Sequence, residues 1–209
     1  MSVTTPSILP QRRRRKWAAA GLCIVALWAF ALYVHPFLAI NEPVDADTMV
    51  VEGWVPAYVL DGAAREIVRG KYAHVFVAGM ESEEGGESDA AGAARYLVAA
   101  QVSPSIIIDS TTPATSWNRT SHMARAVRDR MDLLGIKPKG VNVLTLGSHG
   151  RQSRLAYRRI LGPQILVGVI TIPKNDYDPA RWWASLAGVK KTTKDFAGWL
   201  KETLLGLRS

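Results

Sequence analysis

The sequence predicts an α/β fold, a Rossmann-like parallel sheet with helices on both faces, preceded by one transmembrane helix. A long segment without charged residues lies near the N-terminus. After it, short apolar segments rich in β-branched residues alternate with longer segments whose apolar residues recur every three or four positions. Glycine follows several of the short segments, as it does where a strand turns into a helix. These observations together favour a membrane anchor joined to one domain built from β-α units.

The anchor is predicted at Trp17–Ile40, a segment of 24 residues without Asp, Glu, Lys or Arg. As a helix it would be about 36 Å long, enough to cross a hydrocarbon core of about 30 Å. The basic cluster Arg12–Lys16 precedes it directly, and positive charge resists translocation, so residues 1–16 should form a cytoplasmic tail. The protein is therefore expected to cross the inner (plasma) membrane once, with its C-terminal domain outside the cytoplasm.

A cleaved signal peptide is the alternative for this segment, with Ala29-Phe30-Ala31 as the cleavage site. The apolar segment continues beyond Ala31 to Ile40, which is longer than a signal peptide requires, and this favours an uncleaved anchor. Residues 41–47 are polar and are expected to be a linker. The remaining residues, 48–209, are expected to form one domain, because about 160 residues suffice for a single sizeable core.

Each element of this domain is predicted from its apolar pattern and from the Gly, Pro or Asp that bounds it. Strands are expected over residues 49–51, 74–78, 105–108, 141–146 and 165–172. Helices are expected over residues 58–69, 90–100, 115–134 and 152–161, with further helical sequence up to the C-terminus. Because strands and helices alternate throughout, consecutive strands should be parallel and the helices should cover both faces of the sheet.

Charge and composition exclude several classes of function. Five of the 26 basic residues precede the anchor, and the other 21 nearly balance the 18 acidic residues. The domain shows no basic stripe interleaved with aromatic residues, so nucleic-acid binding is not expected. The lone cysteine, Cys23, lies inside the apolar segment, so the domain can form no disulfide. No metal-binding or Walker-type nucleotide motif is present, and the sequence identifies no cofactor.

Ligands of open parallel sheets bind beyond the carboxyl ends of the strands, so the loops after the predicted strands are where a site is expected. Polar groups follow four of these strands, at 52–54, 79–88, 109–118 and 147–151. Glycine at the ends of three strands would let backbone N–H groups approach a ligand, and tight β-α turns are the alternative reason for Gly53, Gly79 and Gly147.

The strongest local signal is Ser148-His149 followed by Arg151 at the start of a predicted helix. A helix N-terminus attracts anions, and Arg adds a bidentate donor for phosphate or carboxylate. His149 is the best candidate for a catalytic acid or base. The alternative is a capping serine in front of a solvated basic helix. Trp182-Trp183, near the C-terminus, fits a ligand-stacking, membrane-facing or core role.

The order of several short motifs resembles the YdcF-like family, which includes the SanA and ElyC envelope proteins. The first strand ends in Val50-Val51-Glu52-Gly53 and the second in Val77-Ala78-Gly79. Ser88-Asp89-Ala90 then opens a helix that continues to Tyr96-Leu97, with Asp89 where the family has Glu. The similarity covers about residues 47–165.

Two later motifs extend this resemblance with departures. Where the family has Ser-x-x-Thr-x-Glu-Asn after an acidic residue, this chain has Asp109 and then Thr112 to Asn118, with Thr115 in place and Trp117 in the position of Glu. The fourth strand leads from Thr145 to Ser148-His149, but Arg151 is out of register and Gln152 stands where Arg is usual. The resemblance implies a Rossmann-like fold and a role in cell-envelope maintenance.

The sequence thus predicts a membrane-anchored protein of cell-envelope biogenesis or maintenance whose domain binds a small anionic ligand, nucleotide-like or phosphorylated. Whether the domain is an enzyme stays open. The competing hypothesis is a non-catalytic module that recruits envelope proteins through Trp182-Trp183. The residues expected to bind the ligand are Gly53, Gly79, Asp89, Asp109, Thr112, Thr115, Asn118, Ser148, His149 and Arg151.

Overall fold

The computed structural model describes residues 11–207, and residues 1–10 of the predicted cytoplasmic tail lie outside them. It confirms the predicted fold class, since the domain is built on a five-stranded, all-parallel sheet. The spatial order is β3-β2-β1-β4-β5, so the order reverses direction between β1 and β4. The strands are β1 (Thr48–Glu52), β2 (His74–Met80), β3 (Ile107–Thr112), β4 (Gly140–Leu146) and β5 (Leu166–Ile172).

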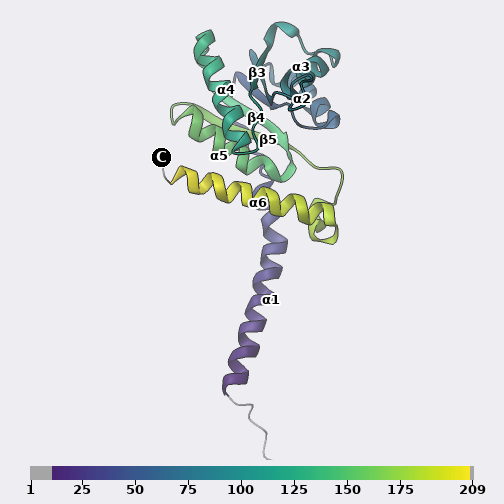
Figure 1. Cartoon of the computed structure of the whole chain (residues 1–209), viewed down its shortest axis with the longest axis vertical. Helices are drawn as coiled ribbons and strands as arrows, with labels where there is room; N and C mark the ends of the chain where they lie inside the picture. The colour runs from purple at the N-terminus through teal and green to yellow at the C-terminus, as the bar shows by residue number, and fades with distance from the viewer. Residues whose placement is uncertain (1–10, 208–209) are drawn as a thin grey trace, which may run out of the picture.

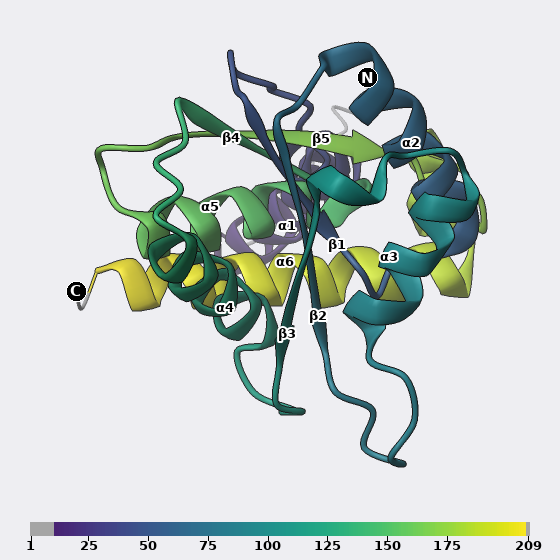
Figure 2. The ribbon, with the colours of Figure 1, turned by 90° about the horizontal axis from the view of Figure 1, so that it is seen from above.

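Helices cover both faces of the sheet because alternate residues of its central strands point to opposite sides. Met49 and Val51 of β1 pack with the buried residues of α2 and α3, whereas Val50 packs with those of α4 and α5 (Figure 2). All of these strand residues are fully buried. The helices are α2 (Ala57–Gly70), α3 (Asp89–Ala99), α4 (Arg119–Leu134) and α5 (Gly150–Leu161).

Strand β3 differs from the prediction that it begins at Ser105. Pro104–Ile106 forms a short 3-10 turn, η1, and the strand starts at Ile107 and extends to Thr112. The extension follows the neighbouring strand, because Gly79 and Met80 of β2 pair with Thr111 and Thr112. Ser and Thr fit this edge position, where pairing rather than apolar burial fixes the backbone.

Helix α1 (Gln11–Leu38) projects from the domain as a separate rod (Figure 1). Between Arg15 and Leu38 it is long and apolar enough to cross a membrane. Its last turns, however, belong to the packing of the domain: Val34 and Leu38 are buried in a cluster with Tyr177 and Trp182. The segment predicted as a linker is also fixed, because Glu42 pairs with Val169 of β5.

The C-terminal helix α6 (Leu186–Gly206) runs crosswise to α1 at the base of the domain (Figure 1). It follows the short 3-10 segment η3 (Pro179–Ala184). Asp195 of α6 bonds to Ser148, which follows β4, and to Lys174, which follows β5. Helix α6 therefore lies across the carboxyl edge of the sheet, at the end from which α1 emerges.

Candidate functional site

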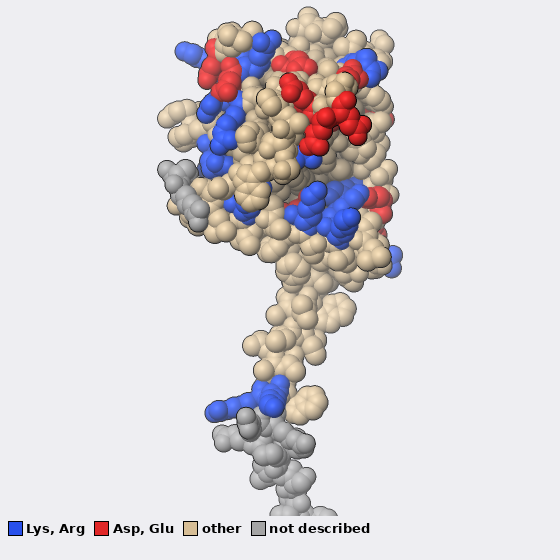
Figure 3. Space-filling view, in the orientation of Figure 1, with Lys and Arg blue, Asp and Glu red and all other residues tan. Residues whose placement is uncertain are grey.

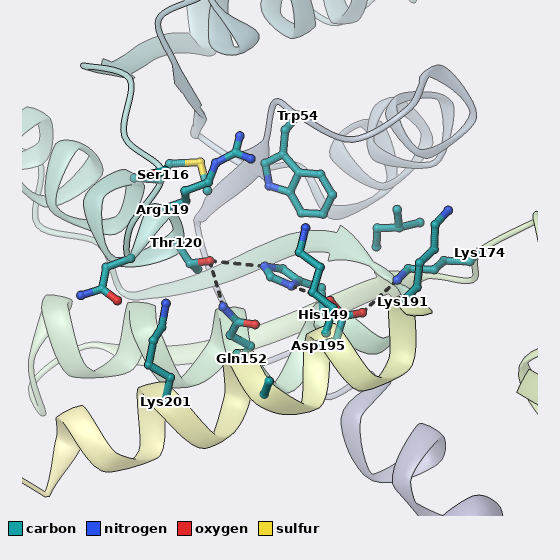
Figure 4. Close-up of a pocket in the computed structure, with 16 residues that line it drawn as sticks. Trp54, Ser116, Arg119, Thr120, His149, Gln152, Lys174, Lys191, Asp195 and Lys201 are labelled. Carbon is teal, nitrogen blue, oxygen red and sulfur yellow. Dashed lines mark hydrogen bonds and ion pairs between the residues drawn. The ribbon is translucent and has the colours of Figure 1, made fainter. Parts of the chain in front are cut away.

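A cavity of about 490 Å³ lies beyond the carboxyl ends of β1 and β4, at the point where the strand order reverses (Figure 4). This is the position at which open α/β sheets bind ligands. Its walls come from six parts of the chain: Trp54 after β1, the start of α4, the end of β4 with His149, Gln152 of α5, Lys174 after β5, and one face of α6. The lining residues are Trp54, Ser116, Asn118, Arg119, Thr120, Met123, Leu146, His149, Gln152, Lys174, Lys191, Lys194, Asp195, Ala197, Gly198 and Lys201.

His149 occupies the centre of this cavity wall, in the 3-10 segment η2 (Gly147–His149) between β4 and α5. Its Nδ1 lies 3.3 Å from Oδ1 of Asp195, and its Nε2 lies 3.3 Å from Oγ1 of Thr120. The edge of the ring packs against Trp54, with ring centroids 5.2 Å apart. The imidazole is thus held on three sides, from α6, from α4 and from the loop after β1, which fixes its orientation toward the cavity.

Two carboxylates favour the protonated form of His149. Burial lowers its pKa, but the hydrogen bond to Asp195 and the charges of Glu52 and Asp195 outweigh burial and the opposing charge of Lys174, so the pKa lies above its ordinary value. Burial raises the pKa of Asp195, yet His149, Lys174 and Ser148 together hold that pKa well below its usual range. Both shifts favour a protonated imidazole beside an ionised carboxylate over the neutral pair.

Glu52 supplies the second carboxylate and lies beneath the cavity, with no exposed surface. Thr145 donates to its Oε2 at 2.5 Å and Ser153 donates to its Oε1 at 2.9 Å. Its Oε2 lies 3.9 Å from Nε2 of His149. A carboxylate this deeply buried needs such donors, and β1, β4 and α5 each provide part of its surroundings.

Basic side chains dominate the cavity charge. Arg119, Lys174, Lys191, Lys194 and Lys201 line the cavity, whereas Asp195 is the one carboxylate among its described lining residues. Asp195 is itself bonded to Lys174 at 2.9 Å, with Ser148 and His149 completing its contacts.

The other cations keep their charge largely available to a ligand. Lys194 forms no ion pair with a described residue. Nζ of Lys201 lies 4.8 Å over the ring of Trp117, and Arg119 lies 3.8 Å from a half-exposed Asp89. Lys191 pairs with Asp176 at the rim. The cavity is consequently electropositive.

The structure brings part of the predicted site together. Asn118 and His149 line the cavity. Ser148 lies directly behind it, fully buried, with its hydroxyl bonded to Asp195. Asp89 lies at the edge, near Arg119. Gly53 and Gly79 are close to the first turn of α3 instead, since a Cβ at Gly79 would lie 2.2 Å from the backbone nitrogen of Ala90. Glycine is required at these two positions because the strand ends pack closely against the backbone of α3.

The remaining predicted residues lie elsewhere. Arg151 donates to the carbonyl of Phe37 and its guanidinium lies 4.1 Å over the ring of that residue, so it points toward α1. Asp109 and Thr112 line a separate, shallower hollow beside α4, and Asp109 accepts from the backbone N–H of Thr111. Thr115 accepts from the backbone N–H of Trp117. None of these four lines the cavity around His149.

Lys174, Asp195 and the lysines of α6 were not predicted to be site residues, and Glu52 was predicted only to lie at the end of the first strand and in the polar loop that follows it. One signal was available: Glu52 directly follows an apolar strand, in a position where a charged residue is buried and has to be paired. Another was the recurrence of Lys190, Lys191, Lys194 and Lys201, which gathers basic groups on one side of α6. Their meeting with His149 depends on how α6 packs, which no local pattern specifies.

Chemically, this arrangement provides a cationic cavity, an aromatic wall at Trp54 and an imidazole whose protonated form is favoured by two carboxylates. It suits the binding of an anion, with His149 as the group best placed to exchange a proton with it. Comparison of the chain with models of protein families, with curated proteins and with solved structures found no match.

Proposed function

We propose that the protein is a membrane-anchored protein of cell-envelope biogenesis or maintenance whose domain binds a small, phosphate-bearing anion in the cavity around His149. The excess of basic groups lining this cavity is the observation that supports the proposal most directly. Lysine and arginine hold phosphate through charge-assisted hydrogen bonds, which are about twice as strong as neutral ones. The cavity lies at the strand-order reversal, where this fold class places its ligands.

Each wall of the cavity has a part in this proposal. Lys194, Lys201 and Arg119 would hold the phosphate oxygens, because their charges are only weakly paired. His149 would donate a hydrogen bond from Nε2 once the ligand displaces the weak contact to Thr120. Trp54 offers a flat apolar surface for a ring, which suits a nucleotide-like ligand.

The role in the envelope rests on the resemblance to the YdcF-like family and on the predicted orientation of the anchor. The match of α1 in length and apolarity to a membrane span supports the anchor. The competing hypothesis, recruitment of protein partners through Trp182-Trp183, is less well supported. Trp182 is buried, and its Nε1 donates to the carbonyl of Ala31 at 2.7 Å. This side chain joins the domain to α1, which leaves it unavailable to a partner.

Lys194→Ala is expected to weaken the binding of a phosphate-bearing ligand about 10- to 150-fold, since a lost charge-assisted contact costs about 1.5–3 kcal/mol. The measurement is titration calorimetry of the full-length protein in detergent with inorganic phosphate, pyrophosphate and a series of nucleoside diphosphates. The melting temperature should stay within a degree or two of wild type, because Lys194 is exposed and makes no ion pair with a described residue.

Lys190→Ala is the matched control, because Lys190 is an exposed lysine of the same helix that does not line the cavity. It should bind each compound as wild type does. Equal weakening of ligand binding in both variants would show that the overall charge of α6, and not a contact in the cavity, causes the effect, and would contradict the assigned site. Failure of the wild-type protein to bind any of the compounds would contradict the proposed function itself.

The proposed topology is tested with reporter fusions at Ser209. Alkaline phosphatase, which is active only outside the cytoplasm, should be active there, whereas a reporter that requires the cytoplasm should be inactive. The physical reason is that the basic cluster Arg12–Lys16 resists translocation and so stays on the cytoplasmic side. Neutralising this cluster is the control and should reduce the activity of the phosphatase fusion. The reverse pattern of reporter activities would rule out the orientation.

A further inference from the structure

The length of α1 sets how deeply the domain sits against the bilayer. The basic cluster before α1's apolar part ends at Lys16, and the segment from Trp17 to Leu38 has 22 residues, which corresponds to about 33 Å of helix. A bilayer core is about 30 Å thick. Almost all of the apolar part of α1 is therefore needed to cross it, including the turns from Phe30 to Phe37.

Those same turns are where α6 and η3 pack. The ring of Phe30 lies 5.3 Å from that of Phe196 and 6.2 Å from that of Trp182, and the ring of Phe37 lies 4.9 Å from that of Trp199. If the bilayer stopped short of α6, only residues 17–29 would remain in hydrocarbon, about 20 Å of helix. The bilayer surface has to rise to the level of α6.

The outer face of α6 has the composition that this position requires. Leu186, Leu200, Leu204 and Leu207 are 89%, 43%, 52% and 79% exposed, an unusual concentration of large apolar side chains on a soluble surface. With Val189 and Phe196 they recur at helical spacing along one stripe, which we call the apolar stripe of α6 (Leu186, Val189, Phe196, Leu200, Leu204 and Leu207).

The direction of this stripe follows from α1. Phe196 touches Phe30, which lies about two turns closer to the N-terminus of α1 than Phe37 does. The stripe accordingly faces the bilayer. Lys190, Lys194 and Lys201 lie along one flank of this stripe, and Figure 3 shows basic side chains gathered on the lower part of the domain, above α1. An apolar stripe beside a lysine-rich face is the pattern of helices that lie in a membrane interface.

We propose that α6 lies in the outer interface of the bilayer that α1 crosses, with its apolar stripe among the acyl chains and its lysines at the lipid headgroups. Trp183 and Trp199, which are partly buried at the joint with α1, then lie at interface depth, where such side chains prefer to lie. The inference concerns where the domain sits and does not depend on the ligand of the cavity.

The test uses full-length protein in which Cys23 is replaced by Ala and single cysteines are introduced at Leu200 and Leu204, each carrying a nitroxide spin label. The protein is reconstituted into vesicles of phosphatidylglycerol and phosphatidylethanolamine. Both labels should be several-fold more accessible to oxygen, which partitions into lipid, than to a water-soluble nickel chelate. Val68→Cys is the control, because Val68 is 66% exposed on α2, away from α1, and should report free access to the chelate.

Two outcomes would overturn the proposal. Labels at Leu200 and Leu204 that are as accessible to the chelate as the label at Val68 would place α6 in water. Labels shielded from both oxygen and the chelate would show that protein, and not lipid, covers the stripe. Because Leu200 and Leu204 are exposed, substitution there should not disturb folding, and circular dichroism of each variant checks this.

Discussion

Arg159→Met is expected to lower the free energy of unfolding by about 3–5 kcal/mol, because it leaves a buried carboxylate without its cation. Glu202 of α6 has no exposed surface, and its Oε2 lies 2.6 Å from Nη2 of Arg159 on α5. Ser121 of α4 donates to the same carboxylate at 2.9 Å, so one buried group joins three helices. Chemical denaturation of the full-length protein in detergent, followed by tryptophan fluorescence, measures the loss.

Arg158→Met is the control at the neighbouring position, where the side chain is exposed and makes no ion pair with a described residue; it should change the free energy by less than about 0.5 kcal/mol. Adding Glu202→Leu to Arg159→Met should recover most of the loss, since a buried pair replaced by apolar residues is often neutral. A double variant as unstable as Arg159→Met would show that the packing of these side chains, and not the orphaned charge, sets the cost.

Asp195→Asn is expected to cost a similar amount, about 3–5 kcal/mol, because Lys174 is buried and its ammonium lies 2.9 Å from the lost carboxylate. It should also lower the pKa of His149, since that pKa is raised by the hydrogen bond and the charge of Asp195. Denaturation measures the first effect, and the ring-proton resonance of His149 followed by NMR measures the second. Asp129→Asn, at an exposed site on α4, should change neither.

The ion pair of His149 and Asp195 predicts how the stability of the protein varies with pH. The pKa of His149 is higher in the folded than in the unfolded protein. Its protonation therefore stabilises the fold fully below about pH 6.5, and this stabilisation is lost as the pH rises through the pKa of His149 in the folded protein. Wild type should therefore lose stability as the pH rises from about 6.5, and Asp195→Asn should lose less over that rise. At the acid end, Asp195 contributes stability above about pH 4 that declines as it becomes protonated. If both proteins lost the same free energy of unfolding as the pH rises, His149 would be excluded as the source of that loss.

The fold was predictable because each of its elements leaves a local signature. Strands such as Val75–Ala78 are continuous apolar runs, which is what burial on both faces of a parallel sheet requires. The start of β3 was placed too early because Ser105 and Ile106 look like strand residues, whereas Pro104 begins a 3-10 turn there. Residues 41–47 look like a linker because they are polar, yet Val44 donates its backbone N–H to the buried Asn142.

The site was predictable only in part. Ser148 and His149 were found because they follow a strand, and the rule about carboxyl ends needs no tertiary information. Arg151 was grouped with them by its nearness in sequence, but on α5 it points away from His149, toward Phe37. Asp195 lies 46 residues from His149. Nothing in the local sequence indicates that α6 returns across the sheet edge to complete the site, so this partner needed the structure.

The strands of the sheet all point toward the end of the domain from which α1 emerges, and this orientation affects how the cavity is reached. If α1 crosses a bilayer, the cavity around His149 opens beside the lipid headgroups. Where anionic lipids give the outer leaflet a surface potential of about −30 mV, it would reduce the local concentration of a doubly charged anion from solution about tenfold. An anion carried by a lipid already lies in that layer and arrives by diffusion in two dimensions. The lysines of α6 would offset part of this potential locally, and an anion carried by a lipid would still reach the cavity more readily than one that arrives from solution.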